Sequence, residues 1–208
     1  MVVVDNLGDG CMQYCISSEE DLKHKGTVPL ETNRFMLRKF QLSDSHDVYE
    51  NWSSDYDSAR YNAWNVHENE AVTKSYIFEW VENYKRLNYY NWAVWDKEND
   101  EVIGSISATN IKNKKKYCEI GYTVAKKRWN EGIATEVLVK VLDFLTSEVG
   151  FETIRAMHDV RNVSSGRVME KAGMVFIKNK IQIFLSGHNY LMKCRVYEYR
   201  NSSTIIFK

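Results

Sequence analysis

Nine consecutive residues, Arg128 to Glu136, carry the clearest chemical signal in this chain, because a strand-like run turns abruptly into an amphipathic helix there. Residues 117–124 form the strand-like run, and apolar side chains recur at helical spacing after the turn, at Ile133, Val137, Leu138, Val141, Leu142 and Leu145. The first N–H groups of a helix lack intrahelical partners and lie at the positive end of its dipole, so they stabilise an anion such as a phosphate. Gly132 lets the backbone approach a bulky ligand closely. The pattern predicts a phosphate site, and the alternative is a plain turn before a helix.

The composition limits the architecture and the partners. With 208 residues, 44% of them hydrophobic and 13% aromatic, the chain is long enough for one well-buried globular core. The formal net charge is zero, which gives no global basis for binding nucleic acid. The charge is uneven, however, since residues 41–70 are rich in Asp and Glu and residues 112–128 are rich in Lys and Arg. One region can attract a cation and the other an anion, unless both are simply solvated faces.

The cysteines and the chain start indicate the compartment. The four cysteines, Cys11, Cys15, Cys118 and Cys194, show neither a CxxC pair nor a spacing with histidine that suits zinc. We therefore expect no metal site and a reducing, cytoplasmic setting. Residues 1–5 lack the basic start and long apolar core of a signal peptide, and no later run reaches membrane-spanning length, so we expect a soluble chain without a membrane partner.

Two regions follow from the periodicity. Residues 1–30 are weakly periodic and end near Pro29, the only proline, which predicts an N-terminal extension over 1–30 and one domain over 31–208. Within the extension, residues 17–25 are predicted to form a short helix. In the domain, strands are predicted at 35–38, 92–95, 102–106, 117–124, 153–157, 174–185 and 190–199, the last two joined at Ser186-Gly187. Helices are predicted to begin at Ser43 or Asp44 and to cover about 70–88, 133–148 and 164–171.

The order of these elements defines a fold class. In the helix over 70–88, one buried stripe is predicted from aromatic and apolar residues at every fourth position, namely Val72, Tyr76, Trp80 and Tyr84. The series β-α-α-β-β-β-α-β-α-β-β predicts an α+β fold in which helices flank a mixed, mostly antiparallel sheet.

Four motifs in this order resemble the GNAT acetyltransferases, in particular the branch that includes the ribosomal-protein N-terminal acetyltransferases. They are Thr32–Arg38, Glu119–Tyr122, Trp129–Glu136, and Asn162–Ser165 leading to Glu170–Met174. The resemblance covers about residues 32–200, nearly the whole predicted domain. It implies the GNAT fold, with a splayed central strand pair, and transfer of an acetyl group from acetyl-CoA as co-substrate to an amine.

The resemblance also implies where acetyl-CoA binds. In that family the loop matching 129–134 holds the pyrophosphate with backbone amides, and the pantetheine arm lies between the strands matching 119–124 and 153–158 like a missing strand. Asn162 and Ser165 match the family's Asn-x-x-Ser, which contacts the pantetheine end, although a turn followed by a helix N-cap is the alternative. The cofactor residues implied in this way are Ile120, Tyr122, Thr123, Val124, Trp129, Asn130, Glu131, Gly132, Ile133, Ala134, Thr135, Asn162 and Ser165.

The phosphate loop departs from the family at two positions. Where this branch has a glycine and then a basic residue, the chain has Asn130 and Glu131. Asparagine tolerates left-handed backbone angles, so the first change is mild. A carboxylate beside a pyrophosphate is repelled unless it points to solvent or pairs with a cation, and the candidates nearby are Lys126, Lys127 and Arg128.

Proton transfer needs a base for the amine and an acid for the leaving thiolate. Glu119, on the strand that borders the thioester in the family, is the first candidate for the base through a water, and His158 on the next strand is the second. A glutamate paired with a lysine and a structural histidine are the respective alternatives. Ser165 is the first candidate for the acid, with Tyr122 behind it, because the tyrosine that usually follows Asn162 in the next helix is absent.

The sequence indicates only the chemical class of the acceptor. The acidic region 41–70 falls on the segment that covers the acceptor side in the family, which suits a protein N-terminus or a small cationic amine such as a polyamine or an aminoglycoside. We expect direct attack in a ternary complex. A noncatalytic domain that binds acyl-CoA or a protein partner is the third interpretation, which Glu131 favours and the intact Gly132 and Ala134 oppose. We expect no nucleic-acid partner, and either a monomer or a homodimer.

Overall fold

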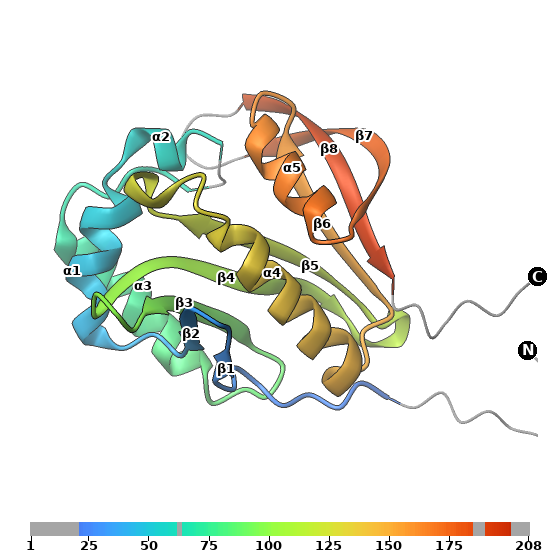
Figure 1. The fold of residues 1–208 in the computed structure, drawn as a ribbon, viewed down its shortest axis with the longest axis horizontal. Coiled ribbons are helices and arrows are strands. Elements are labelled where there is room, and N and C mark those ends of the chain that lie inside the picture. Colours follow the sequence, from blue (N-terminus) through green and yellow to red (C-terminus); the bar gives the residue numbers. More distant parts are fainter. Residues whose placement is uncertain (1–20, 62–63, 185–189, 201–208) are drawn as a thin grey trace, which may run out of the picture.

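Strand-forming runs assemble into one open sheet in the computed structural model of the chain, which describes residues 21–61, 64–184 and 190–200 (Figure 1). The strands are Leu30–Glu31 (β1), Phe35–Arg38 (β2), Tyr90–Asp96 (β3), Glu101–Lys112 (β4), Tyr117–Val124 (β5), Thr153–Asp159 (β6), Val175–Phe184 (β7) and Tyr190–Arg200 (β8). Their order across the sheet is β1-β2-β3-β4-β5-β6-β8-β7. Neighbouring strands are antiparallel except β5 and β6, which run parallel. This arrangement confirms the predicted α+β fold with a mixed, mostly antiparallel sheet.

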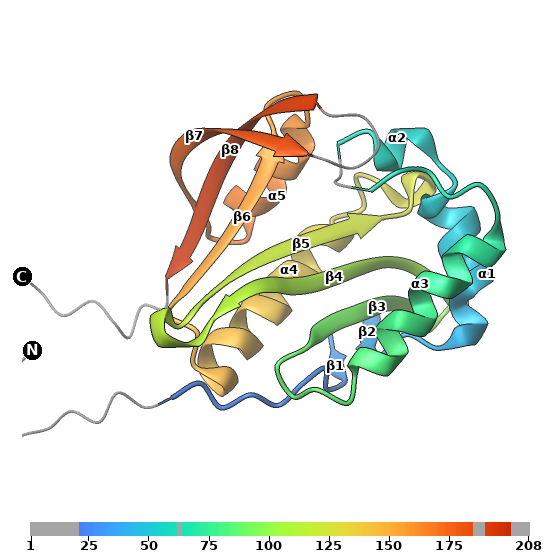
Figure 2. The ribbon, with the colours of Figure 1, turned by 180° about the vertical axis from the view of Figure 1, so that it is seen from behind.

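Helices cover both faces of the sheet. They are Ser45–Val48 (α1), Tyr56–Ala59 (α2), Glu70–Asn83 (α3), Ile133–Asp143 (α4) and Val163–Lys171 (α5), with π-helical turns at Tyr49–Ser53 and Phe144–Val149 and 3₁₀ turns at Leu42–Asp44, Asn113–Lys115 and Lys126–Arg128. The α4 and α5 helices lie on one face (Figure 1), and α3 and α1 lie on the other (Figure 2). None of the helices in the described ranges has both the length and the apolar character needed to cross a membrane.

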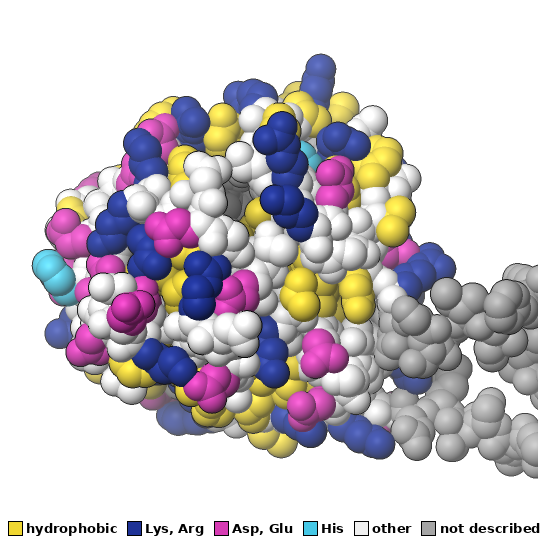
Figure 3. All heavy atoms as spheres, in the orientation of Figure 1, with side chains coloured by type: hydrophobic (Ala, Val, Ile, Leu, Met, Phe, Trp, Pro, Cys, Tyr) yellow, Lys and Arg dark blue, Asp and Glu magenta, His cyan; other side chains and the backbone are white. Residues whose placement is uncertain are grey.

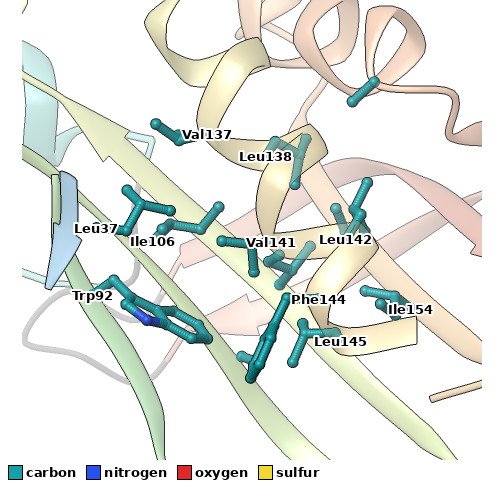
Figure 4. Close-up of a cluster of buried hydrophobic side chains, with 14 of the residues drawn as sticks. Leu37, Trp92, Ile106, Val137, Leu138, Val141, Leu142, Phe144, Leu145 and Ile154 are labelled. Atoms are coloured by element: carbon teal, nitrogen blue, oxygen red, sulfur yellow. The ribbon is translucent and has the colours of Figure 1, made fainter. Parts of the chain in front are cut away.

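The main core lies between α4 and the sheet. Five side chains of the predicted apolar stripe are at most 1% exposed, namely Val137, Leu138, Val141, Leu142 and Leu145. They lie in one cluster with Trp92 on β3, Ile106 on β4 and Ile154 on β6, which are fully buried (Figure 4). Burying each such side chain contributes roughly 1.5–3 kcal/mol, so this stripe fixes where the start of α4 lies relative to β5.

In its first half, the α3 helix turns a different face to the core than the sequence predicts. The prediction of a helix over 70–88 is too long, because α3 ends at Asn83. The predicted stripe is correct only in its second half: Trp80 and Tyr84 are partly buried and pack against the core, but in the first half the buried residues are Thr73 and Ile77, and Tyr76 is 46% exposed. Thr73 can be buried because its hydroxyl lies 2.8 Å from Nδ1 of His67, and the ring of Tyr76 stacks on the same histidine outside the core.

The described part of the N-terminal extension packs against the domain without forming a helix. Residues 17–20 of the predicted helix lie outside the described residues, as do Cys11, Cys15 and the turn at Ser186-Gly187, and residues 21–25 are not helical. The Lys23 N–H donates to the carbonyl of Val149 at 2.9 Å, and the indole of Trp92 donates to the carbonyl of Val28 at 2.7 Å. The segment therefore covers one end of the main core.

Gly104 on β4 is expected to be irreplaceable because the backbone of β5 lies directly over it. A Cβ at this position would lie 2.4 Å from the carbonyl oxygen of Thr123 and 3.3 Å from Cα of Val124. Neither strand can move away without breaking their ladder, so Gly104→Ala should lower the free energy of unfolding by about 2–3 kcal/mol in urea titrations. The matched control is Gly121→Ala on β5, where an added Cβ meets nothing within 4 Å. Equal urea midpoints for the two variants would contradict this prediction.

Candidate functional site

The central feature of the site is the short ladder between β5 and β6. These strands pair only at Tyr117–Glu119 and Thr153–Arg155, and then they diverge. Beyond that point β5 stays paired with β4 on its other edge, as far as Val124. Within the described residues, the edge of 120–124 that faces β6 therefore has no strand partner. An extended ligand with amide groups can pair with such an edge.

A cavity of about 560 Å³ occupies the gap and continues to the start of α4. Its walls come from α2, β5, the loop before α4, the end of β6 and α5. The surface is hollowed beside α5, where Lys and Arg side chains stand at the rim (Figure 3). Small-molecule sites have volumes of roughly 300–1,000 Å³, so the cavity has the size of a ligand site. Every residue predicted from the sequence to contact the cofactor lines this cavity except Glu131.

The loop before α4 presents backbone donors to the cavity. Asn130 and Gly132 have left-handed backbone angles, with φ of 67° and 78°. The first helical hydrogen bond runs from the Glu136 N–H to the Gly132 carbonyl at 3.1 Å. In the described structure the N–H groups of 133–135 therefore have no intrahelical acceptor, and they lie where the helix dipole is positive. This geometry matches the predicted phosphate site, and no described residue blocks it.

Arg128 neutralises the carboxylate of Glu131. The Nε atom of Arg128 lies 3.0 and 2.9 Å from the two carboxylate oxygens, and its Nη1 donates to Asp96 at 2.7 Å. Asp96 is buried, which by itself would raise its pKa, but hydrogen bonds from Arg128 and Asn99 outweigh the burial and hold the pKa at about 2. Of the three cations available in the sequence, Arg128 is thus the partner of Glu131. Glu131 does not line the cavity, and its negative charge is offset by Arg128.

Tyr122 and Ser165 meet across the gap between β5 and α5. The Tyr122 hydroxyl lies 3.0 Å from both the carbonyl oxygen and Oγ of Ser165. Burial raises the pKa of Tyr122, so the phenol stays protonated and can donate. The side chain of Asn162 accepts from the Ser165 N–H at 3.3 Å, so the N-cap that sequence analysis offers as an alternative role is present. The sequence gives no sign of the Tyr122–Ser165 contact, because it joins residues 43 positions apart.

His158 lines the cavity, but its free ring nitrogen does not face a ligand. The side chain is 6% exposed, and Nδ1 donates to the carbonyl of Asp159 at 2.7 Å. The other nitrogen, Nε2, is buried without a partner in the described structure, and a Cβ on Gly166 would lie 2.7 Å from it. Burial lowers the pKa of His158, which keeps the ring neutral. A substrate can reach Nε2 only if α5 moves.

Glu119 lies just outside the cavity lining. Its Oε1 accepts from the Tyr117 hydroxyl at 2.7 Å and from the Asn110 side chain at 3.0 Å, so the described partners are neutral groups and not a lysine. Side chains alternate along a strand, so Glu119 shares a face of β5 with Gly121 and Thr123, which do line the cavity. Ser165 approaches β5 from the opposite face, beside Tyr122.

The acidic region 41–70 is largely paired within the structure. Asp44 binds Arg38 at 2.8 Å, and Asp57 binds Lys126 at 2.6 Å and Arg60 at 3.1 Å. The cavity itself has a mainly basic lining, made by Arg60, Arg128, Arg161, Arg167 and Lys171 against Asp57 alone. The two α5 cations, at 167 and 171, make no ion pair with any described residue, so they suit an anionic ligand. No group of three or more His, Cys, Asp or Glu in the described ranges is arranged to hold a metal ion.

Comparison with known proteins identifies the family. The family model of the acetyltransferase (GNAT) domain matches residues 34–175, and the chain belongs to this family of N-acetyltransferases, which use acetyl-CoA. A relative, the uncharacterized N-acetyltransferase YoaA of Bacillus subtilis, is 28% identical over 144 residues, which are 69% of this chain and 81% of the relative. The recognition and the enzyme class predicted from the sequence are confirmed.

Solved structures show the same fold. The ribosomal-protein-S5-alanine acetyltransferase from Vibrio fischeri superposes with a TM-score of 0.73 at 18% identity, covering 84% of this chain and 97% of that one. The microcin C7 self-immunity acetyltransferase MccE, in complex with acetyl-CoA and AMP, superposes with a TM-score of 0.69 at 16% identity, covering 81% and 93%. At these identities the similarity establishes the fold, including the splayed strand pair, and not the acceptor.

Proposed function

We propose that this chain transfers an acetyl group from acetyl-CoA to a primary amine by direct attack in a ternary complex, with a protein N-terminal amine as the first acceptor class. The observation that carries the proposal is the continuity of one cavity from the unpaired edge of β5 to the N–H groups at the start of α4. Backbone groups of 120–124 would hold the pantetheine arm, and those of 132–135 the pyrophosphate. The cofactor supplies the activated thioester.

Ser165 is the proposed acid and Tyr122 the residue that orients it. The Tyr122 phenol can donate to Ser165 Oγ at 3.0 Å, which leaves the serine O–H free to point into the gap. Ser165 can then pass its proton to a thiolate there, and the phenol proton moves to Ser165 Oγ in its place. This arrangement supplies a tyrosine to the site although none follows Asn162 in α5.

Glu119 remains the proposed base, because His158 is closed off by Gly166. An amine that lies over Gly121 is within one water of a carboxylate two residues away on the same face of β5. Glu119 would then take the proton of the amine on one face of β5, and Ser165 would give a proton to the leaving thiolate on the other face.

The basic lining favours an acceptor with a single amine over a polyamine. A spermidine-like ligand would bring several positive charges toward Arg167 and Lys171, which make no ion pair with any described residue, whereas the nearby acid, Asp57, is already paired. The name of the Vibrio fischeri structure, an S5-alanine acetyltransferase, supports a protein N-terminus. The name of MccE, an immunity acetyltransferase, keeps a small-molecule acceptor as the second candidate. The pairing of Glu131 with Arg128 removes one reason for a noncatalytic domain.

The function is tested by acetyl-CoA calorimetry followed by amine-dependent thiol release. We expect a dissociation constant in about the micromolar range and turnover with peptides that carry a free N-terminus. The same peptides with a blocked N-terminus are the matched control, and spermidine and an aminoglycoside are the small-molecule acceptors. Faster release with a small amine would reverse the order of the two acceptor classes, and binding without any turnover would favour the noncatalytic interpretation. Absence of acetyl-CoA binding would overturn the proposal.

Glu119→Gln should reduce turnover at neutral pH by roughly 100-fold, the scale of a general base, while acetyl-CoA affinity stays unchanged. The loss should shrink at high pH, where the amine loses its proton to solvent. Glu152→Gln is the matched control, because that glutamate pairs with Lys116 on the surface and lies outside the cavity lining. Turnover equal to that of the unaltered chain would remove Glu119 as the base.

Tyr122→Phe should lower kcat about tenfold with little change in acetyl-CoA affinity, because the ring remains and only the orienting hydroxyl is lost. Ser165→Ala should lower kcat more than Tyr122→Phe does. If Tyr122 acts through Ser165, the double variant should be no slower than Ser165→Ala alone. Additive losses in the double variant would show that the two hydroxyls act independently.

A further inference from the structure

Arg34, in the turn between β1 and β2, contacts the phosphate loop from outside the cavity. Its backbone N–H donates to Oε1 of Glu136 at 3.2 Å, and its Nε donates to Oε2 at 2.8 Å. Its Nη2 donates to the backbone carbonyl of Glu131 at 3.1 Å. The side chain is 45% exposed and does not line the cavity, so it is neither a core residue nor a ligand contact.

The bond to the Glu131 carbonyl sets the direction of the next amide. A trans peptide group is planar, and its C=O and N–H point in opposite directions. The carbonyl of Glu131 points outward to Arg34, so the N–H of Gly132 in the same peptide group points inward. Gly132 lines the cavity at the start of α4. Arg34 therefore fixes the orientation of one amide that faces the ligand, without touching the ligand itself.

This peptide group needs an external anchor. It lies between Asn130 and the first turn of α4, and both Asn130 and Gly132 adopt left-handed angles. An added Cβ at Gly132 would meet only Arg34 Nη2, at 3.9 Å, so packing does not hold the peptide in place. Arg128 holds the carboxylate of Glu131 but leaves its backbone free to rotate. The carbonyl bond from Arg34 is the described contact that selects one peptide orientation.

Glu136 holds Arg34 in position for this contact. Its carboxylate binds both the backbone N–H and the guanidinium of Arg34, and it lies in the first turn of α4, where the helix dipole favours negative charge. Burial would raise the pKa of Glu136, but hydrogen bonds from Thr32 and Arg34 outweigh it and lower the pKa. The pair therefore stays charged at neutral pH and ties the loop to the β1–β2 turn.

We infer that Arg34 is a positioning residue for the pyrophosphate of acetyl-CoA, acting by turning the Gly132 N–H into the cavity. The inference rests on the proposed function, because it assumes that acetyl-CoA occupies this cavity. It goes beyond that function by assigning loop preorganisation to a residue outside the site.

The experiment compares two ligands that differ in the pyrophosphate. Arg34→Ala should weaken acetyl-CoA binding about tenfold in calorimetry, the scale of one hydrogen bond from a charged group. Acetyl-pantetheine, which has the same thioester arm without the pyrophosphate, should bind Arg34→Ala and the unaltered chain equally, within about twofold. KM for acetyl-CoA should rise while kcat stays constant. Arg34→Lys should recover part of the affinity because an ammonium can still donate to the carbonyl.

Arg86→Ala is the matched control. Arg86 lies on the surface, and its side chain donates a hydrogen bond to the side chain of Asn83. Both residues are distant in sequence from the loop before α4. Urea unfolding of each variant separates folding from binding, and Arg34→Lys keeps the test open if Arg34→Ala folds poorly. Equal weakening of both ligands would indicate a general structural role and overturn the inference, as would unchanged acetyl-CoA affinity. If the unaltered chain binds neither acetyl-CoA nor acetyl-pantetheine, the proposed function itself fails.

Discussion

The early end of the β5–β6 ladder is the constraint on which the rest of the site depends. Both strands are held on their outer edges, β5 by β4 and β6 by β8, so neither can turn back to close the gap. After Glu119 and Arg155 the inner edges separate and leave backbone groups without a strand partner in the described residues. Unpaired backbone groups are costly when they are buried, and a ligand that pairs with them recovers that free energy. The contact between Tyr122 and Ser165 joins β5 to α5 beside this gap.

The phosphate loop shows how a change in a family motif can be neutralised locally. A glutamate at position 131 introduces a negative charge where the family has a basic residue, yet Arg128, three residues earlier, cancels it. Arg128 is itself fixed by the buried Asp96, so the pair cannot easily rotate toward the ligand. Arg34 binds the carbonyl of the same glutamate from the other side. Glu131 thus links two arginines, Arg128 through its carboxylate and Arg34 through its backbone carbonyl.

Local pattern predicts the parts of this protein that depend on local physics. The amphipathic stripe of α4 is readable because it rests on the helical period, and the left-handed angle at Asn130 is compatible with the sequence because asparagine tolerates positive φ. The buried face in the first half of α3 is not readable from the sequence, because the Thr73 hydroxyl is satisfied there by His67 and Ser53, while the larger Tyr76 stacks on His67 outside the core. Nor does the sequence reveal which of the three nearby cations pairs with Glu131, or that Arg34 reaches the loop. Arg34 and Glu131 are 97 positions apart, and only the packing of the β1–β2 turn against α4 joins them.

The charge that a region of this molecule presents to a ligand depends on which of its charged side chains are already in ion pairs, and a count of acidic and basic residues does not give it. The many Asp and Glu residues of region 41–70 suggest that it attracts a cation. Acids of this region, however, already form ion pairs with Arg38, Arg60 and Lys126, or accept hydrogen bonds from backbone groups such as the Val102 N–H. The cavity keeps the cations of α5 without acidic partners in the described residues, beside the positive end of the α4 dipole. Both terms act on the same ligand, and both favour phosphates. In the proposed complex with acetyl-CoA, these positive charges would act mainly on the cofactor, and the wall formed by α2 and β5 would select the acceptor.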